Sequence, residues 1–204
     1  YKADAGSNAI ESAYRIIQQL RELEKKWNAK KDHDKHFCDH HHPVNFNVGK
    51  IAGGDWASSV PSWCTFDMRV GVLPTQTLKE CRQEVEDTIR QAAAKDPFLG
   101  NNLPVVSWEG FQAEPYILQN HEHVRELLAA AHKTVFGAEL DDRRTTGTTD
   151  ARFFGLYAGL PALVYGPQSD DVHGFDERVN MESVRKITQS TALFIAEWCG
   201  LEKV

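Results

Sequence analysis

The densest group of side chains that could bind a metal or move a proton lies near the carboxyl end of the sequence. One imidazole stands there among four carboxylates: Asp170, Asp171, His173, Asp176 and Glu177. This loop follows a short apolar run, Ala162–Tyr165, which Gly166 and Pro167 end, a pattern typical of a buried strand. Because open α/β sheets bind ligands beyond the carboxyl ends of their strands, we expect His173 to contact a metal.

A polar turn precedes this apolar run. Gly147, Thr148, Thr149 and Asp150 are predicted to open a short helix. Free backbone N–H groups at the start of a helix, together with hydroxyl groups, can bind an anion. Arg152 follows this turn in the sequence. Two roles are open for its side chain: a contact with the substrate, or a salt bridge to Asp150.

Taken in this order and spacing, three segments resemble the carboxyl-terminal third of the M20 family of metal-dependent amidohydrolases. They are the GTTDARF turn, the YGP strand end and the HGFDE loop, and the resemblance is to the acetylornithine deacetylase and succinyl-diaminopimelate desuccinylase group. Upstream, GSNAIESA and NVGKIAGGDWASSVPSWCTFDMRV resemble the inserted lid of that family, also called its dimerisation domain. Together the matching segments frame nearly the whole chain.

The resemblance implies a metal centre, commonly of two zinc ions for which cobalt can substitute, and a Glu that acts as general base on a bridging water. Such a metal lowers the pKa of its water towards about 7 and polarises the scissile carbonyl. By the same resemblance His173 is the last metal ligand, and Glu177 is its outer-shell partner in an H-x-x-x-E pattern. Without the surrounding motif, a single loop histidine would be interpreted as a solvated side chain.

The resemblance also implies substrate-binding residues. Arg69 lies on the polar face of a predicted strand, and an Arg near this point of the family pairs with a substrate carboxylate; the alternative is a solvated or salt-bridged side chain. Gly147, Thr148 and Thr149 would bind the same carboxylate or an adjacent polar group. Arg152 belongs to the D-A-R signature that follows them.

The remaining metal ligands, the general base and a lid histidine of that family belong to an amino-terminal segment that this sequence does not contain. A catalytic zinc needs about three protein ligands. We therefore expect an amino-terminally truncated fragment that holds no catalytic residue and is inactive alone.

For the whole protein, the expected activity is metal-dependent hydrolysis of the amide bond of an N-acyl amino acid. An acetylornithine deacetylase-like reaction would release a carboxylic acid and a free amine. The alternative is a non-catalytic dimerising or ligand-binding α/β module without a complete metal site. An H-x-D motif and a Glu-Glu pair upstream of Tyr1 would favour the enzyme, whereas a start codon just before Tyr1 would favour the module.

The pattern of residues 1–113 predicts a ferredoxin-like βαββαβ lid whose first strand is missing. A helix begins after Asn8 and ends near Lys30, two strands with alternating apolar residues cover Val44–Val48 and Cys64–Val70, and GGDWASSVP connects them as a turn. A second helix starts at Thr77 and stops before Pro97, and Val105–Phe111 is expected to be a further strand. We expect the edge strand of this lid to pair with a second copy in a homodimer.

Residues 114–204 predict the carboxyl-terminal part of an α/β zinc-hydrolase catalytic domain. Helices are expected from Asn120 to Gly137 and from Asn180 to Gly200, around the short strand Ala162–Tyr165. Short apolar strands flanked by such helices are typical of an α/β layer.

The composition narrows the class of protein. A net charge of −6 argues against a general nucleic-acid surface. No apolar run approaches the roughly 20 residues of a membrane span, so we expect no membrane partner. Four cysteines without CxxC spacing favour a reducing cytoplasm. We therefore expect a cytoplasmic protein whose partner is a small N-acyl amino acid.

One histidine-rich run allows two interpretations. It contains His33, His36, Cys38, His40, His41 and His42, and imidazole and thiolate are the common zinc ligands. The run shows no paired ligand spacing, however, so an exposed polar loop between helix and strand is the simpler interpretation, and the metal-binding one stays open.

Overall fold

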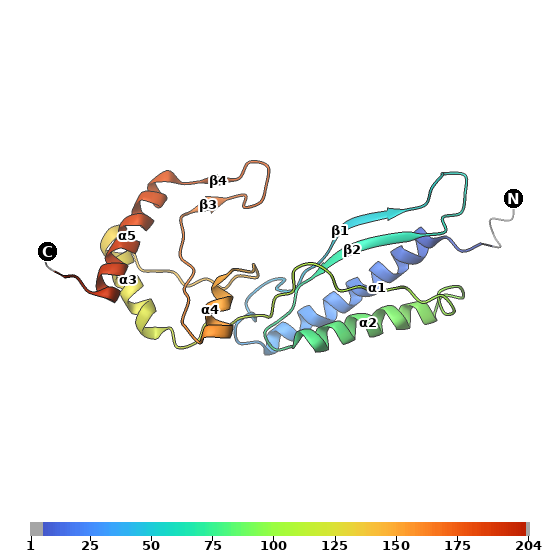
Figure 1. Cartoon of the computed structure of the whole chain (residues 1–204), viewed down its shortest axis with the longest axis horizontal. Coiled ribbons are helices and arrows are strands. Elements are labelled where there is room, and N and C mark those ends of the chain that lie inside the picture. Colours follow the sequence, from blue (N-terminus) through green and yellow to red (C-terminus); the bar gives the residue numbers. More distant parts are fainter. Residues whose placement is uncertain (1–5, 203–204) are drawn as a thin grey trace. The chain divides into compact units, whose positions relative to one another are not determined.

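The computed structural model of the chain describes residues 6–202, and its helices and small antiparallel sheets confirm the α/β class (Figure 1). Residues 1–5 and 203–204, at the outer ends of the two predicted domains, lie outside the described residues. The chain divides into two compact units, Tyr1–Pro115 and Tyr116–Val204.

The first unit is built on a long amphipathic helix, α1 (Ala9–Ala29). Its start is fixed by Asn8, whose side chain accepts hydrogen bonds from the backbone N–H groups of Ile10 and Glu11 and thereby satisfies two amides that lack a helical partner. A 3-10 turn, Lys30–His33, follows the last residue of the helix. Both ends agree with the prediction from sequence.

A β-hairpin and a second helix complete this unit. Strands β1 (Phe46–Gly53) and β2 (Cys64–Val70) pair antiparallel with Phe46 opposite Val70, and a bulge interrupts the register between Val48 and Lys50. Helix α2 (Leu78–Ala94) begins at the predicted position, with a capping box formed by Thr77 and Glu80. Figure 1 shows α1 beside both the hairpin and α2, in accord with their packing.

The core of the first unit lies where α1, α2 and the hairpin meet. Trp27 and Phe46 are fully buried, and their rings meet edge to face with centroids 5.1 Å apart. Leu20, Leu73 and Val85 pack into the same cluster. The Trp27 indole N–H donates to Glu84 on α2 at 2.5 Å, so its polar atom is also satisfied.

Two buried polar residues of α1 bind the backbone just before and at the start of β1. Asn28 donates to the carbonyl of Val44 at 2.8 Å and accepts from the Val44 N–H at 3.1 Å. The Glu24 carboxylate accepts the Phe46 N–H at 2.9 Å and also contacts Arg21 and His42. Burial alone would raise the pKa of Glu24, but the amide of Phe46, Arg21 and His42 together lower it.

The strand predicted at Val105–Phe111 is wrong, since these residues form no ladder in the described structure. In the described residues the sheet of this unit consists of β1 and β2. The segment is instead held by side chains: the Trp108 indole N–H donates to Glu86 of α2 at 2.7 Å, and the Arg82 guanidinium lies over the Trp108 ring. Val105, left without a cover, is 96% exposed.

The second unit contains two packed helices, α3 (Glu122–Phe136) and α5 (Met181–Cys199), and a short helix, α4 (Ala151–Ala158). A two-residue ladder joins β3 (Ser169–Asp170) to β4 (Arg178–Val179). The left-handed Gly137 ends α3 as predicted.

The predicted cap of α3 is wrong, whereas that of α5 is confirmed. Asn120 has a φ of 49°, a left-handed conformation that an N-cap does not adopt, and His121 occupies the cap position without a side-chain bond. Asn180 caps α5 by accepting the N–H of Ser183 at 3.0 Å.

The apolar run Ala162–Tyr165 is not a strand in the described structure, contrary to the prediction. No strand in the described part of this unit lies beside it to share a ladder, and Val164 is 69% exposed. The run is fastened by a side chain: the Tyr165 hydroxyl lies 2.7 Å from Nδ1 of His132 on α3.

A glycine on α4 allows close packing. The ring of Tyr116 lies so near Gly155 that a Cβ at that position would overlap it. This contact ties the start of the second unit to the helix that follows the polar turn.

All four cysteines are free. Cys81 packs in the core, and burial raises the pKa of its thiol to about 11. In residues 6–202 no helix has both the length and the apolar character needed to cross a membrane.

Replacement of Glu24 by Gln should lower the free energy of unfolding by about 2 kcal/mol at pH 7, because it removes a charged acceptor from a buried hydrogen-bond network. The pKa of Glu24 is lower in the folded protein than in the unfolded chain, so its ionised carboxylate stabilises the fold at pH values above the unfolded pKa, near 4.3. This stabilisation is lost as the pH falls through the folded pKa. The difference between the two proteins should therefore shrink towards pH 4 and below.

Urea unfolding followed by tryptophan fluorescence measures this difference. Glu22→Gln, which changes an exposed carboxylate on the same helix, is the control and should have little effect. An unfolding free energy of Glu24→Gln equal to that of the unchanged chain at pH 7 would show that the network does not stabilise this unit.

Replacement of Gly155 by Ala should lower the melting temperature. Helix propensity alone would favour Ala by about 1 kcal/mol, but the overlap with Tyr116 should outweigh this gain, since overpacking typically costs about 1–3 kcal/mol. In a Tyr116→Ala background the same substitution should no longer destabilise. If Gly155→Ala raises the melting temperature of the otherwise unchanged protein, the close packing is not tight in solution.

Candidate active-site edge in the second unit

The polar turn before α4 satisfies part of its own backbone. The N–H of Gly147 donates to Oγ1 of Thr145 at 3.0 Å, and the N–H of Ala151 donates to Oγ1 of Thr149 at 3.1 Å. Thr148 is exposed. A bound carboxylate would have to displace these two local bonds to use the same N–H groups, so the turn is not an open anion site at those positions.

Arg152 lies inside the unit. Only 5% of it is exposed, and its guanidinium carbon is 4.1 Å from the centroid of the Phe153 ring, within the range of a cation–π contact. The side chain is thus anchored on its own helix.

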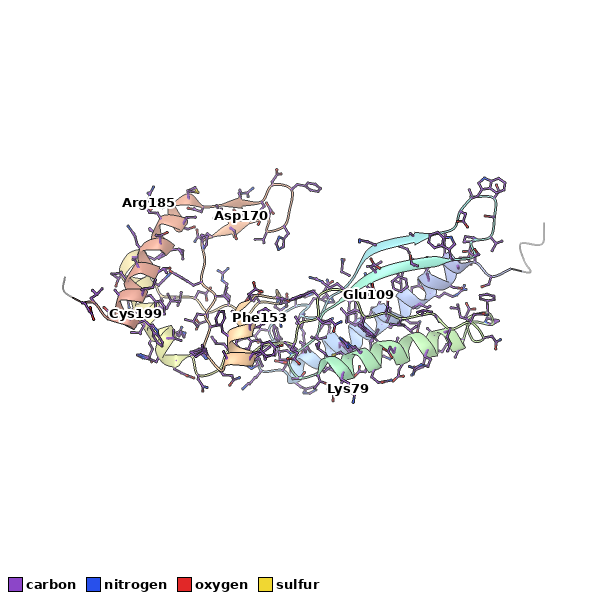
Figure 2. All side chains as sticks on the ribbon, viewed as in Figure 1. Lys79, Glu109, Phe153, Asp170, Arg185 and Cys199 are labelled. Carbon is purple, nitrogen blue, oxygen red and sulfur yellow. The ribbon has the colours of Figure 1, made fainter. Side chains whose placement is uncertain are left out.

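His173 lies at the tip of the β3–β4 hairpin, and Figure 2 places Asp170 on the same hairpin. His173 is exposed. Its backbone φ of 65° is left-handed, and so is the backbone φ of 53° at Asp171. The N–H of Gly174 donates to the carbonyl of Asp171 at 2.6 Å and closes the turn between them. The imidazole is therefore presented outwards on a short, tight turn.

The carboxylates that the sequence places around His173 differ in their surroundings. Asp170 and Asp171 form ion pairs with Arg178 on the opposite strand, at 3.2 and 3.6 Å. Asp176 and Glu177 are exposed in the loop. Of the four carboxylates that lie near His173 in the sequence, two are therefore paired with Arg178 across the hairpin.

The base of the hairpin is bound to the start of α5. The N–H of Gln168 donates to Oγ of Ser183 at 3.0 Å, and the N–H of Asn180 donates to the carbonyl of Gln168 at 2.9 Å. The hydroxyl of Ser183 donates in turn to the carbonyl of Asn180 at 2.6 Å. In the sequence, one residue indicates this contact: Asn180, the polar N-cap of α5.

The described residues do not make up a metal site. Within residues 6–202, no three His, Cys, Asp or Glu side chains lie together in a group that could hold an ion. His173 offers one imidazole, whereas a catalytic zinc takes about three protein ligands. In the histidine-rich run, His42 pairs with Glu24, and the backbone N–H groups of His36 and Phe37 donate to Asp34.

Arg69 belongs to the first unit. It is exposed on the solvent face of β2, opposite Asn47, and two residues from Asp67, which pairs with Lys50 at 3.8 Å. The predicted position on the polar face of a strand is confirmed, and its substrate role stays a prediction.

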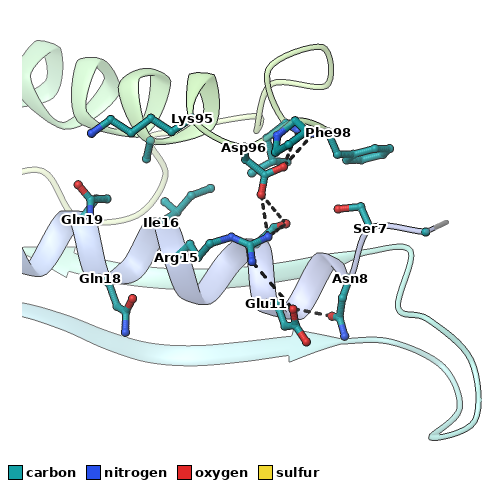
Figure 3. Close-up of a pocket in the computed structure, with 15 residues that line it drawn as sticks. Ser7, Asn8, Glu11, Arg15, Ile16, Gln18, Gln19, Lys95, Asp96 and Phe98 are labelled. Carbon is teal, nitrogen blue, oxygen red and sulfur yellow. Dashed lines mark hydrogen bonds and ion pairs between the residues drawn. The ribbon is translucent and has the colours of Figure 1, made fainter. Parts of the chain in front are cut away.

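A hollow between α1 and the end of α2, with a volume of about 910 Å³, was not expected from the sequence (Figure 3). Arg15 crosses it to Asp96 at 2.7 Å and also donates to Ser12. Asp96 accepts the N–H groups of Phe98 and Leu99. The Leu99 amide lowers the pKa of Asp96 against the effect of burial, and Phe98 and Arg15 lower it further. These charges satisfy each other, and the pair links α1 to the turn that follows α2.

Comparison with known proteins connects the first unit to a family. Residues 2–97 match the model of the peptidase dimerisation domain of the M20 type. This range covers α1, the β1–β2 hairpin and α2, which are the elements that the sequence assigns to a ferredoxin-like lid.

Two curated proteins resemble the chain over both units. An N-formyl-4-amino-5-aminomethyl-2-methylpyrimidine deformylase of Halalkalibacterium halodurans is 26% identical over 97% of the chain, and the protein of the same name from Bacillus subtilis is 27% identical over the same share. The chain spans 48% of the length of each of these relatives. Residues 2–97 are therefore an M20-type peptidase dimerisation domain, and the chain around it is similar to deformylases of that family over nearly its whole length.

Proposed function

We propose that this chain is part of a metal-dependent amidohydrolase of the M20 type, in which residues 1–113 are the lid and residues 114–204 are a portion of the catalytic domain. The observation that carries the proposal is the extent of the similarity: the deformylases match 97% of the chain and therefore also the unit beyond the dimerisation domain. The reaction is the hydrolysis of an amide to a carboxylic acid and a free amine.

For the substrate, we propose an amine that carries a small N-acyl group. The motifs of the sequence resemble acetylornithine deacetylase, whereas the two relatives are named as deformylases of an N-formyl pyrimidine. Formyl and acetyl amides present the same carbonyl to a hydrolase and differ by one methyl group, which a small acyl pocket discriminates by about 1–3 kcal/mol. We favour the formyl amide because both relatives share that name.

Within this proposal, His173 supplies one metal ligand and Glu177 acts on it from outside the coordination sphere. Arg69, Gly147, Thr148 and Thr149 would contact the polar part of the substrate in this proposal. The exposed imidazole at the tip of an anchored hairpin supports the role of His173. The burial of Arg152 favours a role in holding α4 before any role at the substrate.

A second candidate function is a dimerising module without catalysis. The observation that favours it is the match of residues 2–97 to a peptidase dimerisation domain. An assay of the whole protein against N-formyl and N-acetyl amines, with zinc or cobalt supplied, separates the two functions: turnover of either substrate supports the amidohydrolase, and no turnover with a correctly folded protein favours the module.

We further propose that the whole protein is a homodimer formed through the lid. In the described residues β1 pairs on one side only, with β2, which leaves its other edge open. Exposed apolar side chains lie on this strand and on the first turns of α1: Ile51 of β1 is 54% exposed, and Ile10 and Tyr14 of α1 are exposed as well. An open edge with apolar neighbours suits pairing with a second copy.

Replacement of Ile51 by Lys should weaken this dimer, raising its dissociation constant at least about tenfold, because it places a charge in an apolar contact. Light scattering of the whole protein at micromolar concentration gives the mass. Thr65→Lys, on the solvent face of β2, is the control and should remain dimeric. A monomeric mass for the unchanged whole protein would contradict the proposal.

Replacement of His173 by Ala in the whole protein should reduce activity by more than Glu177→Gln does. Loss of a direct ligand removes a metal bond, whereas loss of an outer-shell partner typically costs about 10- to 100-fold. Bound metal per chain should fall in His173→Ala while the far-UV circular dichroism stays unchanged. His123→Ala, another exposed histidine of the same unit, should behave like the unchanged protein. Full activity and full metal content in His173→Ala would rule out the assigned role.

A further inference from the structure

We infer that the loop between β1 and β2 is a binding site for a flat aromatic ring that carries a positive charge. The loop covers residues 54–63, and Figure 1 shows it extending beyond the two strands. It contains Asp55, Trp56 and Trp63. The inference goes beyond the proposed function, because the binding of such a ligand does not depend on hydrolysis.

Two tryptophan side chains of this loop are open to solvent. Trp56 is 71% exposed and Trp63 is 42% exposed. Covering an aromatic surface with another flat ring is favourable, since it removes apolar area from water and allows stacking. Of the aromatic side chains, the indole of tryptophan also gives the strongest cation–π attraction. An exposed Trp56 therefore favours a flat ligand that is also a cation.

Hydrogen bonds within the loop fix the backbone that carries these rings. The N–H of Gly54 donates to the carbonyl of Trp63 at 3.1 Å and closes the loop at its base. The backbone N–H and the hydroxyl of Ser59 both donate to the carbonyl of Trp56, at 3.0 and 2.9 Å. Trp56 thus begins a closed turn, and less backbone freedom is lost when a ligand binds.

The start of α1 supports the same loop. The N–H of Ala9 donates to the carbonyl of Pro61 at 3.0 Å. Ile10 packs against the end of β1, where a Cβ placed on Gly53 would lie 3.0 Å from its Cγ1. The loop is therefore held on a helix as well as on the hairpin.

A carboxylate beside the rings decides the charge of the ligand. Oδ1 of Asp55 accepts the indole N–H of Trp63 at 3.1 Å, and no described residue forms an ion pair with this carboxylate. Elsewhere on the hairpin, Lys50 and Asp67 pair with each other at 3.8 Å. The negative charge of Asp55 therefore remains available, and it favours a cationic ring over a neutral or an anionic one.

The test measures the binding of three small probes to the whole protein by ligand-observed saturation-transfer NMR. 4-Aminopyridine is protonated at pH 7 and offers both the ring and the charge. Cyclohexylamine offers the charge without an aromatic ring, and benzoate offers the ring with the opposite charge. We expect 4-aminopyridine to bind most tightly, because it alone can use both the indole and the carboxylate.

Substitutions assign this binding to the loop. Trp56→Ala should raise the dissociation constant of 4-aminopyridine by about tenfold, and Trp56→Phe should restore part of the loss. Asp55→Asn keeps an acceptor for the Trp63 indole and removes the charge, so it should weaken binding by about two- to fivefold. Phe98→Ala is the matched control: Phe98 is 52% exposed, but the nearby carboxylate of Asp96 is already paired with Arg15. This variant should bind like the unchanged protein.

Three results would overturn the inference. The first is equal binding of all three probes, and the second is an unchanged dissociation constant in Trp56→Ala. The third is a Trp56→Ala protein that is monomeric by light scattering while the unchanged protein is a dimer that binds no probe, since a second copy would then cover this loop. If Trp56→Ala alters the circular dichroism, Asp55→Asn decides alone, and unchanged binding in it counts against the inference. The amidohydrolase proposal stands or falls separately, by the turnover assay.

Discussion

The arrangement of the first unit depends on the buried contacts between one turn of α1 and the backbone entering β1. Asn28 binds both backbone groups of Val44, and Glu24 accepts the N–H of Phe46. These bonds fix the position of the strand along the axis of the helix, so the ring of Phe46 contacts the ring of Trp27. Because a buried acceptor without a partner costs about 1–3 kcal/mol, a shift of the strand would be opposed by polar and apolar contacts together.

The second unit is held differently, by side chains fastened to helices. Tyr165 binds His132 of α3, Gln168 binds the start of α5, and Tyr116 packs against Gly155 of α4. Between these anchors the backbone carries few ladders, and apolar residues such as Val164 are exposed. This uneven covering accords with a chain that spans about half the length of its curated relatives.

The two groups of candidate site residues also differ in the contacts that hold their backbone in place. His173 lies on a hairpin whose base is bound to α5 and in which Arg178 pairs with Asp170 and Asp171. Gly147 and Thr149 lie in a turn whose hydroxyls already occupy two backbone N–H groups. A substrate carboxylate bound there would exchange these local hydrogen bonds for charge-assisted ones, which are roughly twice as strong.

The sequence alone determined the features that depend on near neighbours in the chain. The caps at Asn8, Thr77 and Asn180, the stop at Gly137 and the alternation of β2 were all predictable, because each is decided within a few residues. The resemblance to the M20 family followed from ordered motifs, and residues 2–97 match the model of its dimerisation domain. Only the tertiary structure decided that Val105–Phe111 and Ala162–Tyr165 form no ladder, since a strand depends on a partner far away in sequence. It also decided that Asp170 and Asp171 pair with Arg178, because residues eight and seven apart meet only when the hairpin between them closes.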